Sequence, residues 1–160
     1  MLNLQARYRI FIAAAMALTF LVATDLYAQN EADDGATGQA GFQYWLDIDK
    51  PAVTTDSGLQ YKGLYEGRGR KPKSRANVSV HYRGLLLDGT QFDHSYDSDE
   101  PIRLNLKRVI KGWGEGLQLM SSGSVYVFLI PSELAYGERG SSGIPPDSVL
   151  IFEIELFKSK

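Results

Sequence analysis

VIKGWGEGLQLM, residues 109–120, is the stretch that decides the fold. Trp113, Leu117 and Met120 recur at intervals of four and three residues, which predicts a helix with one apolar face. Three glycines in this stretch remove side chains that would otherwise cover the tryptophan, and the first of them is expected to let the chain turn sharply into the helix. Trp113 is expected to open the helix, packed on one side and reachable on the other.

Six segments around this stretch are predicted to be β-strands, because apolar and polar residues alternate along most of them. They are GLQYKGLY, NVSVHYRGLLL, TQF, IRLNL, SVYVFLI and SVLIFEIELFK. Asp88 and Gly89 form a turn signal between the second and third segments, which predicts a hairpin. SVYVFLI is apolar on both faces and is therefore predicted to be a central strand beneath the helix.

Two of these strands indicate which side chains face the helix. Val78, Val80 and Tyr82 share one face of the second segment, so His81 falls on the opposite face, where a surface position is expected. In the last segment the apolar residues at 150, 152, 154 and 156 share one face in the same way. Strands with a lone amphipathic helix predict an α+β fold, an antiparallel sheet of five or six strands with one short helix packed on it.

The N-terminal part of the chain differs from the rest. Arg7 and Arg9 precede an apolar run, and the small residue Ala28 follows it, an order that predicts a secretory signal peptide over 1–28. The run has about 14 residues, fewer than the roughly 20 that cross a bilayer as a helix. An uncleaved membrane anchor is the alternative. Residues 29–57 are predicted to be a flexible linker, and 58–160 the folded domain.

Two segments allow more than one interpretation. The linker contains an apolar cluster at 42–48, FQYWLDI, which predicts either a short helix docked on the domain or a contact for a partner. GRGRKPKSR, residues 67–75, is basic. It is interpreted as a solvated connection, with contact to phosphate as the alternative.

Composition argues against several classes of activity. A formal net charge of −2 lacks the basic excess of a dedicated nucleic-acid binder, so no nucleic-acid partner is expected. The chain has no cysteine, which removes disulfides and thiolate chemistry. His81 and His94 lack the spacing of zinc ligands, and no Gly-Lys-Ser/Thr follows the glycines around Trp113. We therefore expect no metal and no cofactor, and no constellation supports a hydrolase.

Four motifs occur in a fixed order: VHYRGLLLDGTQFDHSY, VIKGWGEGLQLM, LAYGERG and IPPDSVLIFEIEL. Together they resemble the FKBP-type peptidyl-prolyl cis-trans isomerases over about residues 58–160, and within them the bacterial secreted branch, the macrophage infectivity potentiator-like proteins. The resemblance implies an antiparallel sheet of five or six strands wrapped around one short helix. That branch often carries a helical dimerisation arm. The residues between signal and domain are too few for such an arm, so a monomer is expected.

The resemblance also implies a pocket between helix and sheet. The expected catalytic residues are Tyr82, Asp93, Tyr136 and Phe152. The expected substrate-binding residues are Phe92, Val109, Ile110, Trp113 and Ile144. By the same resemblance, Asp93 accepts a hydrogen bond from Tyr82, and the Ile110 N–H and the Tyr136 hydroxyl donate to substrate carbonyls. A turn-stabilising role is the alternative for Asp93.

Three positions depart from the family's pattern. Ser98 falls near the position where some members of the family have an arginine, which pairs with the aspartate that corresponds to Asp93. Ile102 stands where an aromatic residue often lines the rim of the pocket. Ser141 occupies a place where some relatives have histidine or an apolar residue. These differences are expected to alter the preference for substrates or inhibitors more than the reaction.

The function that the resemblance implies is rotation of X–Pro bonds in exported polypeptides, in the periplasm or after secretion. Its partners would be unfolded or extended proline-containing chains, with macrolide-type compounds as inhibitors and no stable membrane insertion once the signal is cleaved. The alternative is a non-catalytic peptide-binding or chaperone module that uses the same apolar pocket. The presence of every pocket aromatic residue and of Asp93 favours the enzyme.

Overall fold

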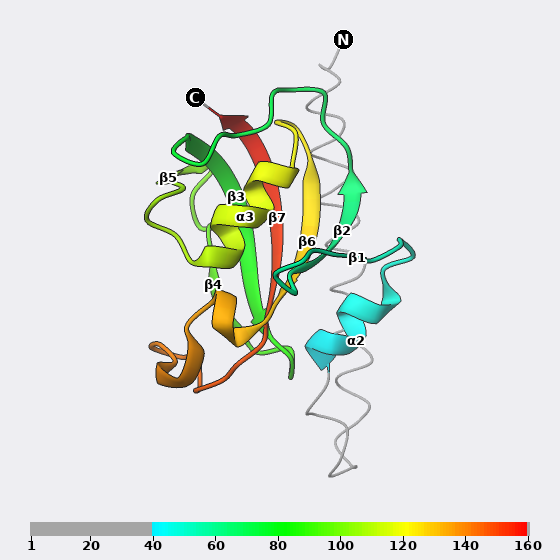
Figure 1. Ribbon diagram of the computed structural model, residues 1–160, viewed down its shortest axis with the longest axis vertical. Coiled ribbons are helices and arrows are strands. Elements are labelled where there is room, and N and C mark those ends of the chain that lie inside the picture. The colour runs from blue at the N-terminus through cyan, green and yellow to red at the C-terminus, as the bar shows by residue number, and fades with distance from the viewer. Residues whose placement is uncertain (1–39, 160) are drawn as a thin grey trace. The chain divides into compact units, whose positions relative to one another are not determined.

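The computed structural model describes residues 40–159 (Figure 1). The predicted signal peptide and the first part of the predicted linker lie outside these residues. The described strands are β1 Val53–Thr54, β2 Gln60–Tyr65, β3 Asn77–Leu86, β4 Gln91–His94, β5 Ile102–Asn105, β6 Val125–Ile130 and β7 Leu150–Ser159. The described helices are α2 Ala40–Asp47 and α3 Lys111–Leu119, with the short 3₁₀ turns η2 Ser132–Leu134 and η3 Gly137–Arg139.

The strands form one antiparallel sheet of seven strands in the order β1-β2-β6-β7-β3-β4, with β5 also paired to β3. This confirms the predicted α+β class and all six predicted strands. The seventh strand is β1, which pairs only Val53 with Tyr61 and Thr54 with Gln60. Two residues are too few to show a period of two, so the sequence pattern could not reveal β1.

Helix α3 lies across the face of β3 and β7 (Figure 1). Trp113, Leu117 and Met120 are all buried in the main core, as the spacing predicts. The helix begins at Lys111 rather than at the tryptophan, so Trp113 is its third residue. The face of β7 that carries Phe152 and its alternate neighbours packs into the same core, in agreement with the strand periodicity.

Two glycines of α3, Gly112 and Gly116, let the helix approach the sheet closely. A Cβ on Gly112 would come within 2.5 Å of Ile130 Cγ2, and one on Gly116 within 2.6 Å of Phe128 Cε1. Gly112 was expected to permit a sharp turn, but its backbone has no positive φ. Glycine at position 112 is explained instead by close packing on Ile130, because any side chain there would push the helix away from β6.

Helix α2 packs on the other face of the sheet. Trp45 is buried in a second core with Val127, Leu129 and Ile151. Lys62 is also buried, and its ammonium group donates hydrogen bonds to the carbonyls of Trp45 and Ile48, at 2.8 and 3.1 Å, near the end of the helix. The apolar cluster at 42–48 is therefore a short helix docked on the domain. The two cores also explain why β6 is apolar on both faces.

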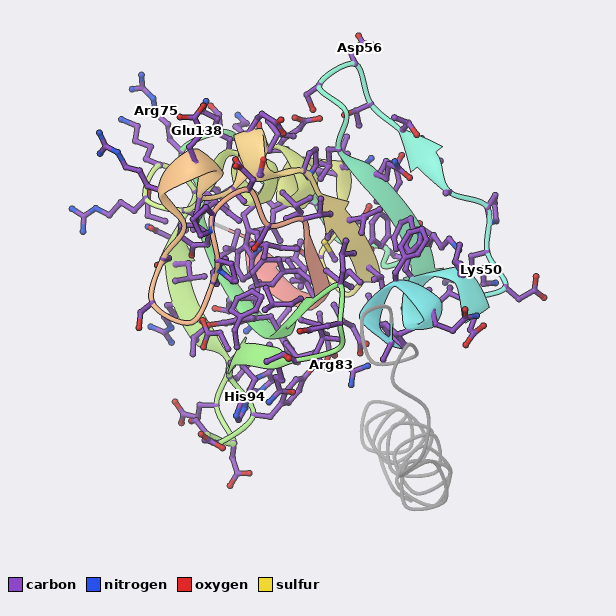
Figure 2. The ribbon with its side chains drawn as sticks, turned by 90° about the horizontal axis from the view of Figure 1, so that it is seen from below. Lys50, Asp56, Arg75, Arg83, His94 and Glu138 are labelled. Carbon is purple, nitrogen blue, oxygen red and sulfur yellow. The ribbon has the colours of Figure 1, made fainter. Side chains whose placement is uncertain are left out.

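A buried polar network joins α2 to the sheet. Arg83 donates to Glu153 at 3.0 Å, and the Tyr44 hydroxyl of α2 donates to the same carboxylate. The Arg83 guanidinium also lies over the Tyr44 ring, 4.8 Å from its centroid, on the side of the molecule where Figure 2 shows Arg83 beside α2. These contacts tie α2 to the outer face of the sheet.

The expected surface position of His81 is wrong. His81 is only 5% exposed, because the chain after β4 folds back over this face of β3. Its Nδ1 lies 3.0 Å from Ser95 Oγ, and its ring lies between Tyr96 and Phe157, at 5.1 and 5.5 Å from their centroids. Alternation along β3 gives the face of His81 correctly but cannot show that a distant segment covers that face.

Candidate active site

A cavity of about 430 Å³ opens between α3 and the sheet. Strands β3, β4, β5 and β7 supply its sheet side, while α3 and the segment before it supply the other side. The connection between η2 and η3 closes one end. The lining residues are Tyr82, Asp93, Leu104, Arg108, Val109, Ile110, Trp113, Tyr136 and Phe152.

Three aromatic rings build the apolar wall of this cavity. Trp113 stands edge-on to Tyr82, with centroids 5.0 Å apart at 85°, and edge-on to Phe152, at 5.2 Å and 85°. Tyr82 and Phe152 lie 6.1 Å apart. Edge-to-face contacts of this kind fix ring orientations and are worth about 0.5–1.5 kcal/mol each beyond the area they bury. The cavity is therefore rigid and apolar on this side.

A glycine in β3 permits this arrangement. A Cβ on Gly84 would lie 2.6 Å from Phe92 and 2.8 Å from Phe152. Phe92 packs edge-on against Phe152, at 5.5 Å and 87°, and so supports the wall from behind. Any larger residue at position 84 would displace one ring or both.

The polar part of the cavity centres on Asp93. The Tyr82 hydroxyl donates a hydrogen bond of 2.6 Å to Asp93 Oδ2. Burial, followed by this hydrogen bond to a carboxylate, raises the pKa of Tyr82 well above its ordinary value near 10. Burial and the Asp93 charge also raise the pKa of Tyr136. Both tyrosines therefore keep their protons and act as hydrogen-bond donors at neutral pH.

Three donors at the cavity have no acceptor among the described residues. The Ile110 N–H makes no such bond, although the Ile110 carbonyl accepts from Gly114 at 3.0 Å. The Tyr136 hydroxyl is unpaired in the described part of the chain, and its residue is 39% exposed. Trp113 Nε1 is buried without a partner there. The Ile110 N–H and the Tyr136 hydroxyl are thus available to carbonyl oxygens of a bound molecule.

Seven of the nine residues expected at the site line this cavity. Phe92 and Ile144 do not. Phe92 stands behind Phe152, and Ile144 is only 6% exposed, in a tight turn where it exchanges two backbone hydrogen bonds with Ser141. Phe92 thus supports the wall from behind, whereas Ile144 is part of the main core.

The structure also shows what surrounds the positions that depart from the family's pattern. Asp93 makes no ion pair with any described residue. Ile102 packs against the main core and does not line the cavity. Ser141 forms the bridge with Ile144 that shapes the turn after η3.

Two lining residues were not expected from the sequence. Leu104 lies in β5, and Arg108 lies in the connection from β5 to α3. Leu104 alternates with Ile102 along its strand, which places both on the helix side but does not say which one reaches the cavity. Arg108 has no periodic signal, because the path of the connection alone brings it to the rim.

Comparison with known proteins gives a consistent result. A family profile described as FKBP-type peptidyl-prolyl cis-trans isomerase matches residues 68–157. The protein of Aeromonas hydrophila named FKBP-type peptidyl-prolyl cis-trans isomerase FkpA is 52% identical over 103 residues, 64% of this chain and 38% of that protein. The peptidyl-prolyl cis-trans isomerase Mip of Coxiella burnetii is 45% identical over 113 residues, 69% of this chain and 49% of its own length.

Solved structures agree with these sequence matches. The crystal structure of FkpA from Escherichia coli has a TM-score of 0.69 at 36% identity, and the match covers 99% of this chain and 74% of that one. The chain nevertheless spans half or less of the length of the curated relatives given above.

Proposed function

Because the chain belongs to the FKBP-type peptidyl-prolyl cis-trans isomerase family, we propose that residues 58–160 catalyse rotation of X–Pro bonds in polypeptides. The observation that supports this most directly is the aromatic cavity at Tyr82, Trp113 and Phe152. A prolyl ring is compact and apolar, so it gains burial there at little cost in conformational entropy. The cavity's volume lies within the usual range of small-molecule sites.

The reaction needs no nucleophile. Rotation about the X–Pro bond breaks amide resonance, against a barrier of about 18–20 kcal/mol. The planar amide has more charge separation than the twisted one. An apolar wall therefore penalises the planar ground state more than the twisted transition state, which is differential binding.

The donors at the cavity orient the substrate. In this proposal the Ile110 N–H and the Tyr136 hydroxyl bind substrate carbonyls on either side of the rotating bond. Asp93, held by the Tyr82 hydroxyl at 2.6 Å, lies beside the twisting amide. Trp113 forms the floor under the prolyl ring. These roles rest on unpaired donors and on ring geometry, which keep the substrate in one orientation while the amide rotates.

The substrates proposed are unfolded or extended chains that contain proline. Export to the periplasm or beyond remains a prediction, because it depends on residues 1–28, outside the described part of the chain. A monomeric state is likewise a prediction. Among the described residues, none of the helices has both the length and the apolar character needed to cross a membrane.

An exchange assay tests the proposal. The full chain is added to a Leu-Pro tetrapeptide, and cis-trans exchange is followed by NMR. We expect the rate constant to rise in proportion to protein concentration. A rate equal to the uncatalysed one, with circular dichroism showing folded protein, would exclude the enzyme. Peptide binding without acceleration would instead favour the non-catalytic binding module.

A further inference from the structure

A second and larger cavity, of about 700 Å³, adjoins the prolyl cavity. It runs along β5 and the adjoining ends of β3 and β7. The two cavities share Leu104, Arg108 and Val109 in their walls. A polypeptide with its proline in the first cavity reaches the second by passing these shared residues and the edge of β5, which pairs only with β3 among the described strands. We call the second cavity the basic groove, for the reason that follows.

Cations line the basic groove, and no carboxylate does. Arg103, Arg108 and Lys158 are in its wall, and each is exposed. None of them forms an ion pair with a residue in the described part of the chain. The pairs of Arg83 with Glu153 and of His94 with Asp97 include no residue of the groove. The cations of the groove thus have no counterion among residues 40–159.

The strand register places two of these cations on either side of one serine. Ser79 of β3 is opposite Arg103 of β5 on one edge and opposite Lys158 of β7 on the other. Directly paired residues of antiparallel strands project to the same face, which is here the face opposite the one that carries Val80 and Leu104. Neighbouring strands are about 4.8 Å apart. Arg103 and Lys158 therefore flank a small serine at roughly 10 Å from each other. A carboxylate between them would interact with both.

The positive charge extends beyond the groove. The loop at 67–75 contains five lysines and arginines, residues 101–111 contain four, and neither segment contains an acidic residue. The two segments are neighbours, because Asn105 Nδ2 donates to the Arg75 carbonyl at 3.3 Å and Leu106 N to the Ala76 carbonyl at 3.1 Å. Figure 2 shows side chains with nitrogen tips gathered near Arg75, on the opposite side of the molecule from Lys50.

We propose that the basic groove is an extended substrate subsite that binds acidic side chains near the proline of the polypeptide. This inference rests on the proposed isomerase function and adds a preference to it. Arg103 and Lys158 contact the carboxylates, and Arg108 stands where the groove meets the prolyl cavity. The loop at 67–75 attracts acidic chains over a longer range, so the effect decreases with salt.

An acidic peptide fits the observations better than a nucleic acid. The whole chain carries a formal charge of −2, so the positive surface is local and not a general property. The groove also shares three wall residues with a cavity that has donors suited to peptide carbonyls, the Ile110 N–H and the Tyr136 hydroxyl. Nucleic-acid binding would need a track of cations across the surface, and it would give no reason for the shared wall.

The experiment compares peptides that differ only in charge. A neutral Leu-Pro peptide is extended by three glutamates on one side of the proline or on the other, or by three lysines. NMR exchange gives the rate per unit of full-chain protein at about 0.02 M and about 0.5 M salt. We expect one acidic peptide to be isomerised about 3- to 10-fold faster than the neutral one at low salt. The difference should shrink to less than about 2-fold at high salt.

Variants locate the effect. Arg103→Glu and Lys158→Glu are each expected to bring the ratio of acidic to neutral rates close to one. Lys50→Glu makes the same change of charge at an exposed residue on the far side of the molecule, and it should leave the ratio unaltered. Thermal melting by circular dichroism verifies that each variant is folded. An unchanged ratio in Arg103→Glu and Lys158→Glu would overturn the proposal.

A binding measurement separates this inference from the proposed function. Fluorescence anisotropy of the labelled acidic and neutral peptides is measured with the same variants. If the neutral peptide is accelerated and the acidic peptides show no advantage, the proposed subsite is wrong and the proposed isomerase activity stands. If no peptide is accelerated but the acidic peptide binds more tightly, and Arg103→Glu removes that difference, the isomerase activity is wrong and the subsite stands. Equal binding of both peptides, with tight binding of a labelled oligonucleotide, would assign the groove to nucleic acid instead.

Discussion

At the scale of single residues, Asp93 combines exposure with a fixed position. Its side chain is accessible to solvent, yet Tyr82 holds one of its oxygens by a bond of 2.6 Å. The turn-stabilising role considered for Asp93 is not supported by any hydrogen bond to a backbone group in the described residues. An exposed carboxylate that is oriented by a cavity tyrosine is better explained by contact with a substrate.

Asp93→Leu should lower the isomerisation rate and leave the fold intact. Loss of one oriented polar group beside the reacting amide costs about 10-fold or more in comparable sites, and we expect a loss of at least several-fold here. The folded state should persist because the side chain is exposed. The NMR exchange assay with the Leu-Pro peptide measures the rate, and circular dichroism measures the melting temperature.

Asp99→Leu is the matched control for this prediction. Asp99 is also exposed, in the loop after β4, and no hydrogen bond or ion pair ties it to the described residues. Its replacement makes the same change in charge and in size, and the rate should stay within about 2-fold of the parent. Equal losses in both variants would mean that net charge, and not contact at the cavity, explains the effect of Asp93.

At the scale of elements, the glycines of α3 have different reasons for their presence. Gly116 fits against Phe128 and leaves no room for a Cβ, whereas a Cβ on Gly114 would meet only the Leu106 carbonyl oxygen at an ordinary 3.6 Å. Glycine within a helix costs roughly 1 kcal/mol relative to alanine. At position 116 close packing offsets that cost, but at position 114 the described structure gives no such compensation.

Gly114→Ala and Gly116→Ala should therefore shift stability in opposite directions. The alanine at 114 should raise the free energy of unfolding by about 0.5–1 kcal/mol through helix propensity. The alanine at 116 should lower it by about 1–3 kcal/mol, because the extra methyl group overpacks the core beside Phe128. Urea denaturation followed by tryptophan fluorescence measures both. A destabilising Gly114→Ala would show that the helix needs glycine there for a reason other than packing.

At the scale of the whole molecule, the sheet is covered on both faces. Helix α3 covers one face and carries the cavity, and α2 covers the other and is tied down by Lys62 and by Tyr44. Covering both faces also buries hydroxyl groups. Tyr126 is 5% exposed, and its pKa is raised above 10 by burial and by its hydrogen bond to Glu66. The free energy of unfolding of the domain therefore depends on pH in the alkaline range.

The free energy of unfolding should decrease above pH 10. An unfolded tyrosine ionises near 10, whereas Tyr126 in the folded chain retains its proton to a higher pH, so the unfolded state gains stability as pH rises between the two values. Its contribution is complete below pH 10 and is lost as pH rises through the folded pKa. The slope is at most about 1.4 kcal/mol per pH unit for one such group. Urea denaturation at pH 8 to 11 measures it.

Tyr126→Phe isolates the contribution of this residue. The phenylalanine fills the same space without an ionisable group, so the decrease in stability above pH 10 should be shallower than in the parent. Tyr96 and Tyr136 also have raised pKa values, but each is about two-fifths exposed, so solvent screening reduces their effect. Identical slopes for the parent and the variant would show that Tyr126 does not hold its proton in the folded state as described.

The sequence by itself determined the helix, six strands and most of the cavity. Helical spacing identifies the buried face of Trp113, Leu117 and Met120, and alternation identifies the inner face of β7. These periods arise from local backbone geometry, so they are visible in any window of a dozen residues. The seven lining residues that were expected came from the resemblance of four ordered motifs to the FKBP-type family, and periodicity alone would not have identified them.

Only the tertiary structure decided what depends on contacts between distant segments. His81 is buried because the residues after β4 cover it, and Gly112 is required because Ile130 lies across from it. Phe92 and Ile144 do not line the cavity, whereas Leu104 and Arg108 do. The basic groove exists because the register of three strands aligns Arg103 and Lys158 on either side of Ser79. Such neighbours are set by the packing of whole elements, which leaves no periodic signal in the sequence.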